Sequence, residues 1–143
     1  MLSNTAKYAI RSVIYLSLFA SESKKAGIKE ISEKLKMPAP FLGKILQVLA
    51  RQKILISTKG PNGGFALGKP AVDITLMDIV KIVDGEDAFD TCIIRTERCS
   101  TDQPCSLHNR ISASRKEIKN IFLNQTIADL ATEFKLDKSK IRI

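Results

Sequence analysis

Apolar residues recur every three or four positions through most of the first fifty residues, which is the spacing of amphipathic helices. The pattern predicts a first helix that Ser3 or Asn4 caps and that the polar stretch 21–27 ends. It also predicts a second helix over 28–35 and, after a break that contains a proline, a third helix over 39–52. The residues expected to face the core are Ala6, Ala9, Ile10, Val13, Ile14, Leu16, Ile31, Leu35, Leu42, Ile45, Leu46, Val48 and Leu49.

The residues after the third helix predict a β-hairpin with a glycine-rich tip. Residues 54–58 are rich in β-branched side chains, and residues 65–67 form a returning strand. Between them lies Lys59-Gly60-Pro61-Asn62-Gly63-Gly64, whose glycines allow positive φ and close backbone approach to a ligand. Two short helices joined by a tight turn and followed by such a hairpin are typical of a winged helix-turn-helix domain. An ordinary polar turn is the alternative.

The second half predicts a short helix, a loop and a long helix. Thr75 and Asp78 form a capping-box-like start for the short helix, which ends at Gly85. The long helix spans about 17 residues and carries a mostly apolar stripe at near-heptad spacing. The positions of this stripe are Leu107, Ile111, Ser114, Ile118, Ile121 and Phe122. Such a stripe needs a partner, so we expect a dimer contact; packing onto its own domain is the alternative.

Positive charge is concentrated in the first half of the chain. Residues 1–70 carry 12 Lys and Arg against 3 Glu, a net charge of +9, and residues 71–143 carry 11 against 12 acidic residues, a net charge of −1. A basic half joined to a neutral half is typical of a nucleic-acid reader joined to a sensing or assembly half. A merely soluble basic surface is the alternative.

All three cysteines and the only histidine of the chain lie within residues 92–108. Six residues separate Cys92 from Cys99, five separate Cys99 from Cys105, and two separate Cys105 from His108. A loop that gathers every soft ligand of the chain is a candidate metal site, and an iron–sulfur cluster suits widely spaced thiolates at least as well as zinc does. A reactive-thiol sensor and plain buried cysteines are the alternatives.

The sequence offers little support for other classes of protein. No apolar run approaches the roughly 20 residues of a membrane helix, and no signal-peptide pattern is present. We therefore expect a cytoplasmic protein with no membrane and no small-molecule substrate as partner. No catalytic motif accompanies the lone histidine, so we do not expect an enzyme. An iron–sulfur electron carrier would need the cysteines but not the basic hairpin.

Several short motifs resemble the Rrf-two family of bacterial winged-helix transcriptional regulators, over nearly the whole chain. They are Lys7-Tyr8-Ala9, Ile31-Ser32-Glu33, Phe41-Leu42, Gly60-Pro61-Asn62-Gly63-Gly64-Phe65 and the three-cysteine loop. The family includes iron–sulfur cluster regulators, nitric-oxide sensors and a repressor of cysteine metabolism. The resemblance implies a homodimeric repressor that binds a double-stranded DNA operator and senses iron–sulfur, redox or nitric oxide status. A cluster-free repressor that responds through cysteine oxidation or a partner protein is the alternative.

The resemblance also implies which residues contact DNA. The third helix would enter the major groove and the hairpin, or wing, the minor groove. The candidates on the helix are Pro40, Phe41, Gly43 and Lys44. The candidates in the wing are Lys59, Gly60, Asn62, Gly63 and Gly64.

For the cofactor, the resemblance implies an iron–sulfur cluster held by Cys92, Cys99, Cys105 and His108. A histidine three residues after the last cysteine favours a 2Fe–2S cluster. Other family members take a carboxylate from near the N-terminus and hold a 4Fe–4S cluster. The matching position here is Tyr8, which is not a carboxylate, so 2Fe–2S is the favoured cluster.

The predicted fold is mainly α with a small β-hairpin wing, arranged as a winged helix-turn-helix domain plus a long dimerisation helix. Residues 1–84 are expected to form the DNA-binding domain, and residues 85–108 a linker and the cluster-binding loop. Residues 107–134 would form the dimerisation helix and a short C-terminal helix that Thr126 caps. Residues 135–143 would form a loose tail.

Overall fold

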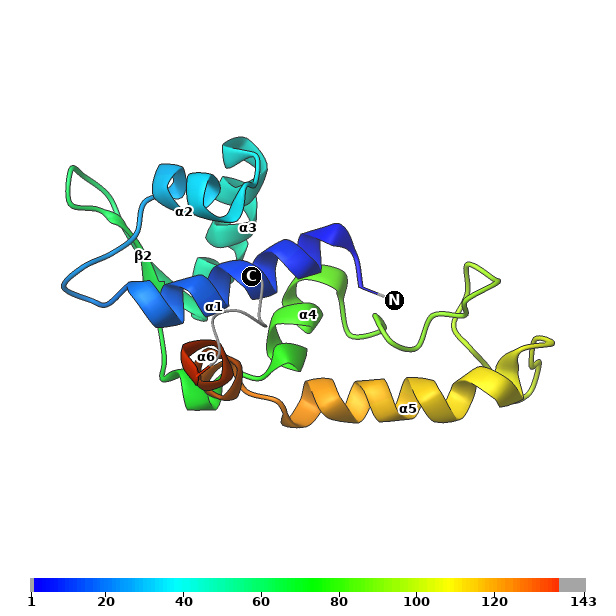
Figure 1. The fold of residues 1–143 in the computed structure, drawn as a ribbon. Coiled ribbons are helices and arrows are strands. Elements are labelled where there is room, and N and C mark those ends of the chain that lie inside the picture. The colour runs from blue at the N-terminus through cyan, green and yellow to red at the C-terminus, as the bar shows by residue number, and fades with distance from the viewer. Residues whose placement is uncertain (1, 137–143) are drawn as a thin grey trace.

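The computed structural model describes residues 2–136, which form six α-helices and one two-stranded hairpin (Figure 1). The predicted tail lies almost wholly outside the described residues. The helices and strands are α1 (Asn4–Phe19), α2 (Ile28–Leu35), α3 (Ala39–Arg51), β1 (Leu55–Thr58), β2 (Gly64–Leu67), the 3-10 turn η1 (Ala71–Asp73), α4 (Leu76–Asp84), α5 (His108–Asn124) and α6 (Ile127–Leu136). The predicted fold class, a mainly α winged helix-turn-helix protein, is confirmed; η1 was not predicted.

The helix ends follow the capping residues in the sequence. The Ser3 hydroxyl accepts a hydrogen bond from the Ala6 backbone N–H at 3.0 Å and so caps α1. Thr75 and Asp78 make both hydrogen bonds of a capping box at the start of α4. α2 ends where Lys36 takes a left-handed conformation at φ 53°, which allows α3 to follow after a short turn.

The wing is an antiparallel hairpin in which Leu55 pairs with Leu67 and Thr58 pairs with Gly64. Phe65 also exchanges two backbone hydrogen bonds with Ala26, of 2.8 and 3.0 Å, so the wing is joined to the segment between α1 and α2. Gly64 has a φ of +143°, and a Cβ there would lie 2.5 Å from the Ala26 carbonyl oxygen. This close approach of two backbones requires glycine.

The core lies between α1, α2, α3, α4 and the inner face of the hairpin. Its fully buried side chains include Leu16, Ile31, Leu42, Leu46, Leu49, Leu55, Ile74 and Ile79. Val48 was expected in this core, but its side chain is 36% exposed. Leu42, Ile45, Leu46 and Leu49 occupy the inner face of α3, and Val48 lies on the outer side of the helix, where it lines an open groove.

After α5 the chain returns to the winged domain. The Ile127 backbone N–H donates to the Ile74 carbonyl oxygen at 2.8 Å, and the Leu76 N–H donates to Gln125 at 3.0 Å. Ile127 is fully buried, and α6 packs against α1. α5 itself runs along one side of the molecule, and the cysteine loop lies at its far end, away from the wing (Figure 1). Within residues 2–136 no helix is long and apolar enough to cross a membrane.

Candidate DNA-reading surface and cysteine site

One outer face of α3 is free of core contacts. Pro40, Lys44, Gln47 and Arg51 are exposed and follow one another at helical spacing, so they share a face. With Gly43, Val48 and Ile28 of α2 they line an open groove of about 440 Å³. Pro40, Gly43 and Lys44 are DNA-contact candidates that the family resemblance implied for this helix. Gln47 and Arg51 were not among these candidates, although their spacing of seven and eleven residues from Pro40 is a signal for the same face.

Phe41 has a packing role in the structure. Its ring meets that of Tyr8 edge-on, with the centroids 5.7 Å apart, which ties the start of α3 to α1. The Phe41 side chain keeps 38% of its surface exposed and lines a smaller pocket with Thr5 and Val83. Phe41 therefore lies at the border of the α3 groove and orients the helix that carries it.

The wing tip exposes Lys59 and Asn62, whereas its glycines shape the turn. The Gly63 backbone N–H donates to the Gly60 carbonyl oxygen at 2.9 Å, and Gly60 has a φ of +106°. A Cβ at Gly63 would collide with the Thr58 carbonyl oxygen. The predicted wing residues thus divide into two exposed side chains and three glycines that fix their position.

The wing tip faces α2 across a second groove, of about 660 Å³. Its charged lining residues are Lys24, Lys25, Lys29, Lys34, Glu30 and Glu33. Four cations against two anions make this groove electropositive, in keeping with the basic first half of the chain.

The four candidate ligands of the second half meet as two pairs. The Cys92 thiol donates to the Cys105 sulfur at 3.7 Å, and the Cys99 sulfur lies 3.0 Å from Nδ1 of His108. Cys92 is buried, whereas Cys99 and Cys105 are half-buried. No three or more His, Cys, Asp or Glu side chains among residues 2–136 form a single group spaced to hold a metal ion.

Backbone hydrogen bonds hold each pair in place. The Cys92 N–H donates to the Glu97 carbonyl oxygen at 2.9 Å, and the Cys99 N–H donates to the Asp90 carbonyl oxygen at 2.8 Å. The His108 N–H donates to the Cys105 carbonyl oxygen at 2.9 Å, and His108 is the first residue of α5. The loop therefore delivers its ligands at the point where the long helix begins.

Two ion pairs, neither of them predicted, connect this loop and its linker to their surroundings. Lys119 of α5 reaches both carboxylate oxygens of Asp90, at 2.9 and 3.0 Å. Arg98 pairs with Asp87 in the linker. Because the Asp90 carbonyl also holds Cys99, the Lys119 contact couples the position of that cysteine to α5.

Hydrogen bonds from the backbone at Arg95 and then Ile94 lower the pKa of the Cys92 thiol below its ordinary value. Burial acts in the opposite direction, and the Cys105 thiol adds to the lowering. Donors aimed at the sulfur favour its thiolate form, which is the form that binds metals.

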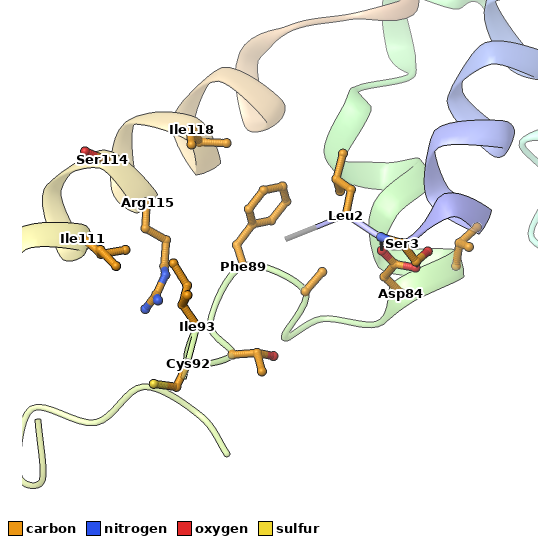
Figure 2. Close-up of a pocket in the computed structure, with 13 residues that line it drawn as sticks. Leu2, Ser3, Asp84, Phe89, Cys92, Ile93, Ile111, Ser114, Arg115 and Ile118 are labelled. Carbon is orange, nitrogen blue, oxygen red and sulfur yellow. Dashed lines mark hydrogen bonds between the residues drawn. The ribbon is translucent and has the colours of Figure 1, made fainter. Parts of the chain in front are cut away.

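The apolar stripe of α5 is only partly covered by its own chain. Phe122 packs on Phe89, with ring centroids 5.0 Å apart, whereas Ile121 is 57% exposed. Nearer the cysteine loop, Ile111, Ser114 and Ile118 form one wall of an open cavity of about 810 Å³ (Figure 2). The other walls include Leu2, Ser3, Asp84, Phe89, Cys92 and Ile93. One end of the predicted dimer stripe thus contacts the winged domain and the rest is open.

Comparison with known proteins places this arrangement in a family. Residues 2–133 match the family model Rrf2, described as an iron-dependent transcriptional regulator. A protein of Aquifex aeolicus that is assigned by name to the HTH-type transcriptional regulators is 32% identical over 90% of this chain and 89% of its own. The HTH-type transcriptional regulator NsrR of Oceanobacillus iheyensis is 27% identical over 86% of this chain and 84% of its own.

A solved structure has the same fold. The global cysteine regulator CymR of B. subtilis superposes with a TM-score of 0.73 at 22% identity, covering 93% of this chain and 97% of that one. At that identity the likeness concerns the fold alone.

Proposed function

Because the chain belongs to the Rrf2 family of transcriptional regulators, we propose that its affinity for an operator is set by an iron–sulfur cluster in the cysteine loop. The protein is a DNA-binding transcriptional regulator and not an enzyme. The cluster, the DNA contacts, the homodimer and a repressor role in the cytoplasm are parts of the proposal.

The DNA-reading surface consists of the outer face of α3 and the wing tip. Lys44, Gln47 and Arg51 offer donors and an acceptor on one exposed helix face, which suits contacts in a major groove. Lys59 and Asn62 extend from the wing to a phosphate or the adjacent minor groove. The electropositive groove beside α2 supports binding to the DNA backbone.

The dimer contact is the open part of the α5 stripe. Ile121 is 57% exposed, although large aliphatic side chains favour burial. In the cysteine loop, Ile93, which lines the cavity beside α5, and its neighbour Ile94 are each 58% exposed. A second copy of the chain would cover these surfaces through a symmetric contact and would place two winged domains on one operator.

The donor set carries the cluster proposal. Three thiols and one imidazole match the soft ligands of a biological iron–sulfur cluster, and the family model is described as iron-dependent. A 2Fe–2S cluster needs two protein ligands for each of its two irons. The pairs Cys92 with Cys105 and Cys99 with His108 match that need, which favours 2Fe–2S over 4Fe–4S. When bound, such a cluster supplies a group that iron depletion, oxidants or nitric oxide can alter.

Contacts within the chain connect the cysteine loop to the winged domain, so binding of a cluster in the loop would affect the position of the DNA-reading surface. His108 begins α5, and the Lys119–Asp90 ion pair links α5 to the backbone that holds Cys99. Fixing four side chains of the loop would fix the start of α5, and α5 leads through α6 into the core of the winged domain. A dimer binds DNA through two winged domains that must match half-sites about 34–36 Å apart, so a small change in the separation of the two domains changes its affinity.

Anaerobic reconstitution of the full chain with iron and sulfide tests the proposal. We expect about two irons and two sulfides per chain and visible absorption, both lost in Cys99→Ala. His108→Ala should retain a more labile cluster, because one of four ligands is missing. Ser100→Ala changes an exposed side chain of the same loop and serves as the control. A colourless wild-type protein with no bound iron would refute the cluster proposal.

A further inference from the structure

The Cys92 and Cys105 sulfurs lie 3.7 Å apart, and a disulfide bond is about 2.0 Å long, so a closure of about 1.7 Å would join them. Residues 100–104 before Cys105 are exposed and adopt neither helix nor strand. The loop can therefore make this small movement without disturbing the core.

Cys99 is held apart from this pair. Its sulfur lies 3.0 Å from Nδ1 of His108, and its backbone N–H is bound to the Asp90 carbonyl oxygen. Three cysteines allow three alternative disulfides, and the structure brings the two sulfurs of one of them, Cys92 and Cys105, into contact. The sequence alone, with spacings of six and five residues, gives no reason to prefer that combination.

The pair is accessible to a small oxidant. Cys105 is half-buried, and Cys92 lines the open cavity of about 810 Å³ beneath α5 (Figure 2). Cys105 is the more exposed of the two residues, so a molecule of the size of hydrogen peroxide would meet the pair first at Cys105.

We propose that Cys92 and Cys105 form a reversible disulfide in the cluster-free protein when it meets a peroxide, and that Cys99 takes no part. First, the Cys105 sulfur attacks one peroxide oxygen and the O–O bond breaks, which gives a Cys105 sulfenic acid and one water. The Cys92 sulfur then attacks the Cys105 sulfur, the S–O bond breaks, and the disulfide forms with release of a second water. Two thiols are oxidised and one peroxide is reduced to two waters.

The disulfide has a consequence that rests on the proposed function. It removes two of the four proposed ligands, one complete pair, so an oxidised chain could not take up a cluster until a dithiol reduced it. Peroxide would then act on the regulator a second time, by keeping the cluster-free chain from reloading.

Peptide mapping of the full-length, cluster-free protein tests the pairing. The reduced protein is treated anaerobically with one equivalent of hydrogen peroxide, blocked with N-ethylmaleimide and cut with trypsin and an Asp-specific protease. The cuts place the three cysteines in separate peptides, residues 90–95, 99–101 and 102–110. We expect residues 90–95 to be linked to residues 102–110, with one maleimide, on Cys99. A dithiol should release the link.

Two matched variants sharpen the result. Cys99→Ser should form the same link with unchanged yield, whereas Cys105→Ser should form no intrachain link. A main link that includes residues 99–101, or three maleimides per chain after peroxide, would overturn the inference. Loading with iron and sulfide then separates the two proposals. Failure of the reduced protein to load would refute the cluster while leaving the disulfide, and loading without any disulfide would do the reverse.

Discussion

Replacing Ile121 with Asp should separate the proposed dimer while leaving the monomer folded. Ile121 is 57% exposed in the single chain, so the substitution costs the monomer little. Full burial of an isoleucine side chain contributes about 1.5–3 kcal/mol, and the exposed part of Ile121 accounts for a little over half of that. Two symmetric copies give about 2–3 kcal/mol per dimer, a roughly 30- to 150-fold rise in the dimer Kd, before any cost of burying the new carboxylate.

The matched control lies two residues further along α5. Leu123 is 44% exposed, but two residues turn a helix by about 200°, so its side chain is on the opposite face. Sedimentation equilibrium of Ile121→Asp, Leu123→Asp and wild-type protein compares the two faces. We expect dissociation in the first variant alone, with circular dichroism unchanged in both. A dimer that survives Ile121→Asp, or that is lost equally in both variants, would refute the assignment of this face.

Three further predictions concern the two functional regions. Arg51 brings a positive charge to the outer face of α3, where it would neutralise a phosphate at the edge of the major groove. Arg51→Ala should therefore lower the slope of log K against log salt concentration by about 1–2 units per dimer. Lys69→Ala, at an exposed lysine that lines neither groove, should leave the slope unchanged, and a slope unchanged in both variants would exclude a phosphate contact of Arg51. Gly64 has a φ of +143°, and a Cβ there would collide with the Ala26 backbone, so Gly64→Ala should lower the free energy of unfolding measured in urea by about 2 kcal/mol or more. Gly27→Ala, where a Cβ meets open space, should lower it by less than about 1 kcal/mol, and equal losses in the two variants would contradict the backbone argument. Asp90→Asn weakens the part-exposed ion pair with Lys119 and should change the free energy of unfolding by less than about 1 kcal/mol. It should nevertheless speed amide hydrogen exchange over residues 91–99, and unchanged exchange there would mean that the ion pair does not hold the loop.

Local rules sufficed to predict most of the fold. α2 has the predicted limits, 28–35, because the left-handed Lys36 and Pro38 end it within a few residues. The capping box at Thr75 forms as expected, because both of its partners lie within one helical turn. The return of α6 to the winged core was not predicted, since it depends on the distant pairing of Ile127 with Ile74.

The cysteine loop shows where sequence reasoning stops. Its composition predicted a shared site for four ligands, but spacing carries no information on which sulfur meets which partner. The pairing depends on the backbone hydrogen bonds of Glu97 and Asp90 and on the ion pair with Lys119, which lies 29 residues beyond Asp90. Likewise, Gln47 and Arg51 can be assigned to the outer face of α3 only when burial shows which side of the helix is exposed.

We propose that a cluster in the cysteine loop sets the affinity of the winged domains for DNA, and one binding measurement tests this directly. A duplex selected from a random library by the wild-type protein provides the operator. Fluorescence anisotropy under anaerobic, reducing conditions then compares cluster-loaded wild-type protein with Cys99→Ala on this duplex at one salt concentration. We expect Kd values that differ by about 5- to 150-fold, the range that a coupling of about 1–3 kcal/mol gives. Equal Kd values, on this duplex and on others selected by the cluster-free variant, would contradict it.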